Sequence, residues 1–161
     1  MNPVGAGRQM AANKRVLMVS STGGHWVQMR RLEPAFDGWQ LHYACTDAAH
    51  RDSVPQPARF HTCPEGSQWA RLRLLWQLAV VAWVLLRVRP AVVVSTGASV
   101  GFFAVALGRL FGARTIWLDS IANVDELSLS GRMAGRFAHL WLTQWPQLAR
   151  PGGPRYLGSV V

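Results

Sequence analysis

The sequence predicts an α/β fold built around a parallel β-sheet. Short apolar segments rich in β-branched residues alternate along the chain with longer segments of helical character. Several of the short segments contain continuous apolar runs, which is typical of strands in a parallel sheet whose two faces are both covered by helices. With 161 residues, of which 50% are hydrophobic, the chain is long enough for one domain with a substantial core.

The individual elements follow from the same pattern. Residues 15–21, RVLMVSS, form the first predicted strand, and residues 91–96, AVVVST, form the most strongly β-branched one. A long apolar helix is predicted at 69–89, because proline at position 90 disfavours helical conformation in the residue before it. Further strands are predicted at 39–46, 59–64, 113–120 and 139–144, further helices at 25–36 and 99–112, the latter closed by Gly112, and a proline-rich loop at 53–57.

The ends of the chain and its cysteines bear on location. Residues 1–14 are small and polar, so we expect a disordered tail without a secretory signal, followed by a single domain at 15–161. Cys45 and Cys63 are far apart and outside any CxxC pattern, which predicts neither a zinc site nor a disulfide framework. We therefore expect a protein of a reducing compartment, on the cytoplasmic side, with no metal and no cofactor.

The charge is strongly positive. Lys and Arg number 17 against 8 Asp and Glu, a formal net charge of +9. Such a balance favours anionic partners: nucleic acid, anionic lipid headgroups or phosphorylated substrates. The basic residues are scattered and not interleaved with aromatic residues, so a nucleic-acid-binding module is disfavoured and no nucleic-acid partner is expected.

Small polar residues follow three of the predicted strands. In a parallel sheet, ligands bind beyond the carboxyl ends of the strands, and right-handed crossovers keep those loops on one side. We therefore expect one rim with candidate ligand-binding loops, made of Ser20, Ser21, Thr22, Gly23, Gly24 and His25, then Ser95, Thr96, Gly97 and Ser99, then Asp119, Ser120 and Asn123.

His25 and Asp119 are the candidate catalytic residues of this rim. A helix N-terminus disfavours the imidazolium, so a neutral His25 can act as a general base. Asp119 can orient that histidine, bind a sugar hydroxyl or be the base itself, and the sequence does not choose. Structural alternatives stay open: a simple Gly-Gly turn, Ser99 as a helix cap and Asp119 as a solvated loop acid.

Several segments together resemble one known family. They are VSSTGGHWVQMRRL, VVVSTGASVGFFAVALGRLFGARTIWLDS and LSLSGRMAGRFAHLWLTQWPQLA, ending in YLGSVV. The chain is similar to the oligosaccharide-biosynthesis family that contains PssD-type bacterial exopolysaccharide proteins and the membrane-side subunit of the two-chain dolichol-linked N-acetylglucosaminyltransferase. The resemblance runs from Arg15 to Val161 and extends more distantly to the N-terminal half of the peptidoglycan GT-B glycosyltransferase.

The resemblance implies a Rossmann-like, acceptor-side half of a GT-B glycosyltransferase divided between two polypeptides. This chain would bind a polyprenyl-diphosphate-linked acceptor at the membrane, and a small partner chain would bind the UDP-sugar. By matching motif, Gly23, Gly24 and His25 fall on the acceptor-side loop, Gly97 and Ser99 on the second glycine loop, and Asp119 where family members more often have glutamate. The length agrees, because a complete two-domain enzyme needs about twice ~150 residues. The alternative is a non-catalytic membrane scaffold or enhancer of a partner glycosyltransferase.

The segment 69–89 is the candidate membrane contact. Its apolar part, from Leu74 to Leu86, reaches only ~20 Å as a helix, against a hydrocarbon thickness of ~30 Å, so we expect no membrane span. Tryptophans along it and arginines at its ends favour a peripheral or monotopic helix on the cytoplasmic face of the inner membrane, and a helix buried in the core is the alternative. The residues expected to contact the membrane are Arg73, Trp76, Val80, Trp83 and Arg87.

Overall fold

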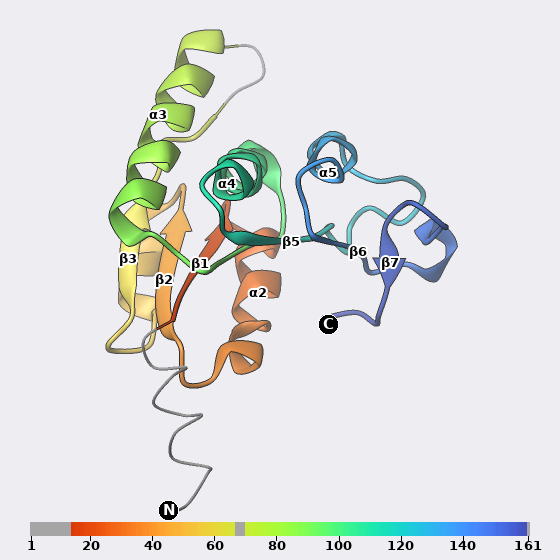
Figure 1. Cartoon of the computed structure of the whole chain (residues 1–161), viewed down its shortest axis with the longest axis horizontal. Helices are drawn as coiled ribbons and strands as arrows, with labels where there is room; N and C mark the ends of the chain where they lie inside the picture. Colours follow the sequence, from red (N-terminus) through yellow and green to blue (C-terminus); the bar gives the residue numbers. More distant parts are fainter. Residues whose placement is uncertain (1–13, 67–69, 161) are drawn as a thin grey trace, which may run out of the picture.

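The computed structural model describes residues 14–66 and 70–160 and confirms the predicted fold class (Figure 1). These residues form one seven-stranded sheet in the order β3-β2-β1-β4-β5-β6-β7. Each of the six neighbouring pairs is parallel. This order is that of a Rossmann-like sheet with one added edge strand.

The strands are short and the helices unequal in length. The strands are β1 (Arg15–Ser20), β2 (Gln40–Cys45), β3 (Arg59–Thr62), β4 (Val92–Ser95), β5 (Arg114–Leu118), β6 (Leu140–Thr143) and β7 (Arg155–Tyr156). The α-helices are α2 (Gly24–Arg30), α3 (Arg71–Val88), α4 (Ala98–Leu110) and α5 (Leu129–Ala134). Three 3-10 helices complete the described elements: η1 (Glu33–Phe36), η2 (Ala48–Ser53) and η3 (Pro146–Leu148).

Helices cover both faces of the sheet, as the apolar strands predicted. Figure 1 shows α3, α4 and α5 on one side of the sheet and α2 on the other. Successive side chains of a strand point to opposite faces, so alternate residues of β1 belong to two different hydrophobic cores. Leu17 and Val19 pack with α3 and α4, whereas Val16 and Met18 pack with Trp26 and Met29 of α2.

The strand order places a switch point between β1 and β4. From β1 the chain proceeds outward through β2 and β3, and then returns to place β4 on the other side of β1. In open α/β sheets the crevice at such a point is the preferred ligand site. The loops at the carboxyl ends of β1 and β4 carry Gly23–His25 and Thr96–Ser99, so two of the predicted rim loops lie at this switch point.

Some predicted boundaries were wrong. The helix predicted at 25–36 is divided into α2 and η1, because Pro34 lacks an N–H and cannot continue an α-helix. The predicted strands are one to three residues too long, and α5 and β7 were not predicted at all. The predicted disordered tail lies outside the described residues except for Lys14, and so does Trp69 at the start of the long helix.

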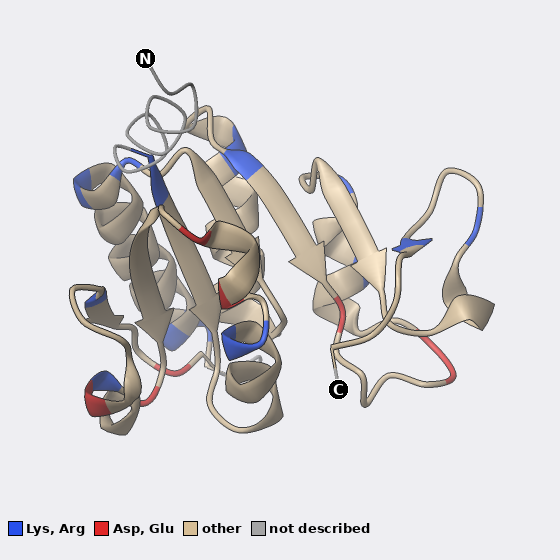
Figure 2. Ribbon diagram, turned by 90° about the horizontal axis from the view of Figure 1, so that it is seen from below, with Lys and Arg blue, Asp and Glu red and all other residues tan. Residues whose placement is uncertain are grey.

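Arginines open several of the strands. Arg15, Arg59 and Arg114 are the first residues of β1, β3 and β5. Figure 2 shows basic segments at the starts of the strands, while a red segment lies at the carboxyl end of β5. The starts of these three strands are therefore basic, and the end of β5 carries an acid. Cys45 and Cys63 are both buried and free.

The histidine of β2 makes stability depend on pH. His42 is 7% exposed. Burial, together with His61, Arg59 and Arg15, lowers the pKa of His42 to about 4. The unfolded chain, where a histidine has its ordinary pKa of about 6.5, therefore binds more protons between these values, and acid favours unfolding.

We expect the free energy of unfolding, measured by urea denaturation, to fall by about 1–2 kcal/mol from pH 7 to pH 5 on account of His42. The variant His42→Gln removes this titration, so its free energy of unfolding is expected to change less over the same interval. An equal pH dependence in both proteins would contradict the assignment.

Candidate functional site

The first loop of the site is the turn between β1 and α2. Gly23 has a φ of 71° and a Cβ placed there would meet nothing within 4 Å, so its glycine is required by the backbone conformation. A Cβ on Gly24 would lie 3.7 Å from Gln28 Nε2, an ordinary contact. Thr22, Gly23 and Gly24 are exposed. This turn therefore presents its backbone to solvent at the switch point.

His25 joins this turn to the loop after β4. Its Nδ1 lies 2.7 Å from Ser21 Oγ, and its backbone oxygen accepts a hydrogen bond from Thr96 Oγ1 at 2.7 Å. The imidazole packs directly on Gly97, where a Cβ would lie 2.5 Å from both Cδ2 and Nε2. Gly97 also has a φ of 147°, so both its backbone and the neighbouring ring require glycine.

The half-buried environment of His25 keeps its ring neutral. Burial lowers the pKa of His25, and the carboxylate of Asp119 partly opposes this effect. The neutral form predicted from the sequence is thus supported, but burial is its main cause. With Ser21 at Nδ1, the two ring nitrogens have different surroundings, and Nε2 lies on the edge that faces Gly97.

Asp119 lies at the carboxyl end of β5 and is 1% exposed. Its carboxylate accepts hydrogen bonds from Ser128 Oγ at 2.6 Å, Ser128 N at 2.9 Å, and Trp117 Nε1 and Asn123 Nδ2 at 3.3 Å. Ser128 also caps α5 by accepting from Gly131 N at 2.8 Å. A Cβ on Gly131 would lie 2.5 Å from Asp119 Oδ1. Asp119 therefore organises the loop before α5, and its contacts explain Ser128 and Gly131 of the LSLSG segment.

Two buried glutamines complete the site, and the sequence reasoning did not single them out. Gln28 of α2 donates to Gly24 O and to Ser120 Oγ, and its Oε1 accepts from Ile121 N at 3.0 Å and from Gln144 Nε2. Gln144, which follows β6, also donates to Asp119 O at 3.0 Å and accepts from Val160 N at 2.9 Å. The two amides thus connect α2, the end of β5 and the C-terminal segment. Their place in the GGHWVQ and QWP segments was the available signal.

The remaining predicted loop residues differ in exposure, from fully buried to exposed. Ser120 and Thr96 are buried and hold the loops together through the hydrogen bonds above. Ser99 donates to the buried Gln77 of α3 at 2.7 Å, so its side chain is engaged away from His25. Thr22 is exposed and lies 2.9 Å from His50 Nε2 of η2. The rim predicted from the strand ends is assembled, but not every member faces solvent.

The residues expected to contact a membrane lie on α3, which has two different faces. Val81, Val84, Leu85 and Val88 pack in the core, and Val80 packs against it. Trp76 and Trp83 are 63% and 57% exposed, and Arg73 and Arg87 are exposed beside them. Among the described residues, no helix combines the length and apolar character needed to cross a bilayer. Helix α3 therefore has a core face, as one predicted alternative requires, and an exposed apolar face, which leaves contact with a membrane a prediction.

Within residues 14–66 and 70–160, the side chains of His, Cys, Asp and Glu form no group of three or more that could hold a metal ion.

Sequence comparisons connect the chain with oligosaccharide biosynthesis. Residues 61–160 match the family model described as "Oligosaccharide biosynthesis protein Alg14 like". The chain is 31% identical over 106 residues to the UDP-N-acetylglucosamine transferase subunit alg14 of Schizosaccharomyces pombe, covering 62% of this chain and 49% of that protein. It is 43% identical over 49 residues to the subunit ALG14 of Eremothecium gossypii, covering 30% of this chain and 22% of that protein. The chain thus spans half or less of the relatives it matches.

Solved structures share the fold at low sequence identity. MurG of Acinetobacter baumannii superposes with a TM-score of 0.73 at 14% identity, over 92% of this chain and 46% of that one. The UDP-GlcNAc 2-epimerase of Methanocaldococcus jannaschii gives a TM-score of 0.60 at 11% identity, over 80% and 39% of the two chains. These likenesses establish the fold, a Rossmann-like half of the kind found in GT-B proteins.

The contact between Gly97 and His25 can be tested by Gly97→Ala. The new methyl group overlaps the imidazole and strains the backbone, so we expect a loss of about 1–3 kcal/mol in the free energy of unfolding. Displacement of the ring toward water is expected to raise the pKa of His25 toward its ordinary value, as measured by NMR.

Gly112→Ala is the matched control, because Gly112 also has a positive φ, 85°, but a Cβ there meets nothing within 4 Å. It is expected to lose stability through backbone strain and to leave the pKa of His25 unchanged. A similar pKa change in both variants would contradict a direct contact.

Proposed function

The chain belongs to the family of Alg14-like oligosaccharide biosynthesis proteins, and on that premise we propose that it is the acceptor-binding, membrane-associated subunit of a two-chain UDP-sugar glycosyltransferase. Both curated relatives are named as subunits of a UDP-N-acetylglucosamine transferase, so UDP-N-acetylglucosamine is the first donor to test. The acceptor is a polyprenyl-diphosphate-linked saccharide. The observation that carries the proposal is a neutral, half-buried histidine at the switch point of the sheet.

In the proposed reaction, His25 is the general base. The acceptor hydroxyl oxygen attacks the anomeric carbon of the donor, the bond from that carbon to the UDP oxygen breaks, and UDP leaves with the bonding electrons. The hydroxyl proton passes to Nε2 of His25. This role requires the tautomer in which Nδ1–H donates to Ser21 Oγ, so Ser21 is a positioning residue.

Asp119 is proposed as a positioning residue and not as the base. Its carboxylate is buried and already accepts four hydrogen bonds, so a substrate proton has no free path to it in this arrangement. It holds the loop before α5, and its negative charge stabilises the imidazolium that forms when His25 accepts a proton.

The acceptor is proposed to lie along the exposed part of the rim. Thr22, Gly23 and Gly24 offer a hydroxyl and accessible backbone there, while Thr96, Gly97, Ser99 and Ser120 support the loops from behind. The donor is proposed to be held mainly by the partner, a small nucleotide-sugar-binding subunit that closes the crevice from the opposite side. The word "subunit" in both relatives' names supports a partner of this kind.

Membrane association is proposed to occur through the exposed face of α3, on the cytoplasmic side of the inner membrane. Trp76 and Trp83 suit the headgroup region, where amphipathic rings are favoured. The exposed arginines at both ends of the helix attract anionic headgroups, each by about 1 kcal/mol near the surface. The other face of the same helix packs in the core, so the rest of the domain stays connected to the membrane-bound helix.

The proposed reaction is tested with purified chains, separate and mixed, with radiolabelled UDP-N-acetylglucosamine and a lipid-linked acceptor. We expect sugar transfer only from the mixture. The variant His25→Ala is expected to lower turnover by about 100-fold or more, the usual size of a general-base contribution.

His139→Ala is the control for that measurement, because His139 is an exposed histidine just before β6, at the opposite end of the strands. It should retain normal turnover. Robust transfer by this chain alone would exclude the divided enzyme, and normal turnover of a folded His25→Ala variant would assign the chemistry to the partner and leave this chain a scaffold.

The proposed membrane face is tested by vesicle sedimentation of the double variant Trp76→Gln, Trp83→Gln. Because both side chains are largely exposed, we expect a folded protein whose binding to phosphatidylglycerol vesicles is weakened by about tenfold or more. Leu157→Gln is the control, since Leu157 is 64% exposed but lies after β7. Equal binding of the double variant and the wild type would place the membrane contact elsewhere.

A further inference from the structure

A hollow of about 660 Å³ lies at the amino end of the sheet, on the side away from the His25 rim. It is lined by the starts of β1, β2 and β3, by the loop that precedes β3, and by the last turn of α3. Its volume is within the range of small-ligand pockets. The parallel strands separate it from the candidate catalytic loops, because those loops follow the opposite ends of the same strands.

Three arginines from three different elements line this hollow. Arg15 opens β1, Arg59 opens β3 and Arg87 lies in the last turn of α3. No lining residue among those the structure describes is acidic. The ion pairs of the described part of the chain, Arg30–Glu33 and Arg132–Glu126, involve none of them. Positive charge therefore converges on a concave surface whose described lining residues include no carboxylate to balance it, which focuses a positive potential there.

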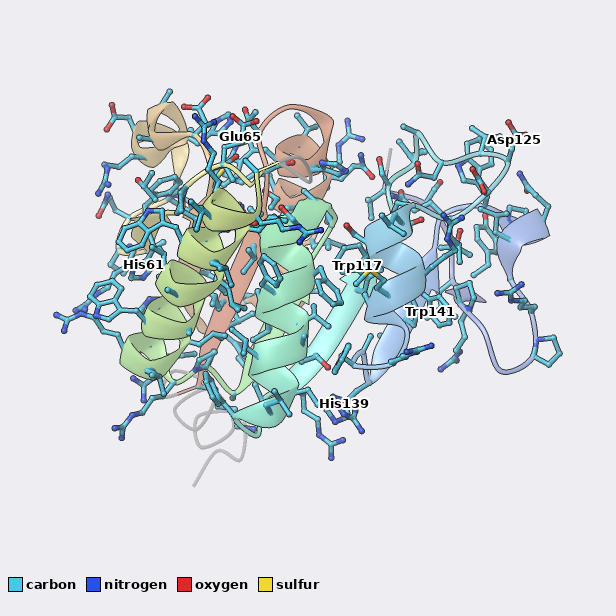
Figure 3. The ribbon with its side chains drawn as sticks, turned by 90° about the horizontal axis from the view of Figure 1, so that it is seen from above. His61, Glu65, Trp117, Asp125, His139 and Trp141 are labelled. Atoms are coloured by element: carbon cyan, nitrogen blue, oxygen red, sulfur yellow. The ribbon has the colours of Figure 1, made fainter. Side chains whose placement is uncertain are left out.

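Two histidines form the inner wall of the hollow. His42 of β2 and His61 of β3 are stacked, with ring planes 11° apart and Nδ1 of His42 3.3 Å from Nε2 of His61. Figure 3 shows His61 beside α3. A hydrogen bond between these nitrogens requires one imidazole to donate and the other to accept. Because the pKa values of both histidines lie below the ordinary value, both rings are neutral near pH 7, and both carry polar nitrogens at the pocket wall.

The field of the arginines acts on both histidines. The pKa of His42 is lowered by burial and then by His61, Arg59 and Arg15. The pKa of His61 is lowered by burial and then by Arg59, Arg51 and Arg87. The same surroundings that disfavour one more positive charge here favour an anion.

We propose that this hollow binds a phosphate group, held by the guanidinium groups of Arg15, Arg59 and Arg87 above the His42–His61 pair. Guanidinium groups present planar, paired N–H donors that match phosphate oxygens. Trp39, Pro55 and Pro57 line the hollow as well and offer an apolar wall to the organic part of a phosphoester. The site does not rest on the transferase proposal, and its test needs neither donor nor partner.

Two sources of phosphate fit this position. Arg87 lies 5.8 Å over the ring of Trp83, which is exposed on α3 next to Leu86, so a phospholipid headgroup at that helix can place its phosphate in the hollow. A soluble phosphoester can enter from solution. The hollow would recognise the phosphate group in either case. The two sources differ in whether a lipid surface competes with soluble phosphate for the hollow.

The site is tested by NMR titration of the full chain with inorganic phosphate and with phenyl phosphate, at constant pH and ionic strength. We expect saturable shifts of the His42 and His61 resonances and a rise in the pKa of His42. The double variant Arg59→Gln, Arg87→Gln changes exposed side chains and is expected to weaken binding by about tenfold or more. The control Arg114→Gln, Arg136→Gln removes the same charge from exposed positions elsewhere and should bind as the wild type does.

Phosphatidylglycerol vesicles distinguish the sources. For the vesicle comparison the pocket variant is Arg59→Gln alone and the control is Arg114→Gln alone, because Arg87 also belongs to the proposed membrane face. If the ligand is a headgroup, the Arg59→Gln variant binds vesicles less than the control variant does, and free phosphate competes with the vesicles. If the ligand is soluble, the two variants bind vesicles equally while only the pocket variant loses phosphate binding. Shifts that do not saturate, or equal phosphate affinity of the pocket and control variants, would overturn the site.

Discussion

The buried amide of Gln28 is the interaction on which the carboxyl edge of the sheet depends. A buried amide is costly unless its donors and acceptors are satisfied, and Gln28 finds partners in its own helix, in the loop after β5 and in Gln144 after β6. These partners belong to three different segments of the chain. Satisfying one side chain therefore fixes the position of α2, and with it the position of His25, relative to β5 and β6.

The same principle explains the rest of the rim. Thr96 bonds the backbone of His25, and Ser128 bonds Asp119 and caps α5 at the same time. Thr96 and Asp119 are thus each engaged with a group from another segment, and these contacts hold the loops together without a ligand. His25 uses only Nδ1 in this network, in its contact with Ser21 Oγ. Its Nε2 lies on the opposite edge of the ring, toward Gly97. Preorganisation of this kind suits a site that must hold a base in one orientation.

Opposite ends of one sheet serve different chemistry. The carboxyl end carries a neutral imidazole and a satisfied carboxylate, whereas the amino end gathers arginines at the starts of strands (Figure 2). Helix α3 runs beside this gradient, with a core face that packs on the sheet and an exposed face that carries tryptophans between arginines. The asymmetry gives the domain a basic, partly apolar side, where we propose that it meets a phosphate-rich surface, and a polar rim, where we propose that the saccharide binds.

The sequence by itself determined the alternation of strands and helices and the residues at the strand ends. These follow from local periodicity, and parallel strands necessarily bring their carboxyl ends to one edge, so GGH, STG and LDS could be assigned to one rim in advance. The order of the strands was decided only by the tertiary structure, because it depends on where the crossover after β3 returns, and no local pattern encodes that. The partnership of Gln28 with Gln144 joins residues 116 positions apart. The short helix α5 depends on Ser128 being held by Asp119, a contact between separate segments that hydrophobic periodicity does not report. The buried face of the long helix could not be predicted either, because its sequence is apolar on every side. Only its packing against the sheet determines which face is buried and which is exposed.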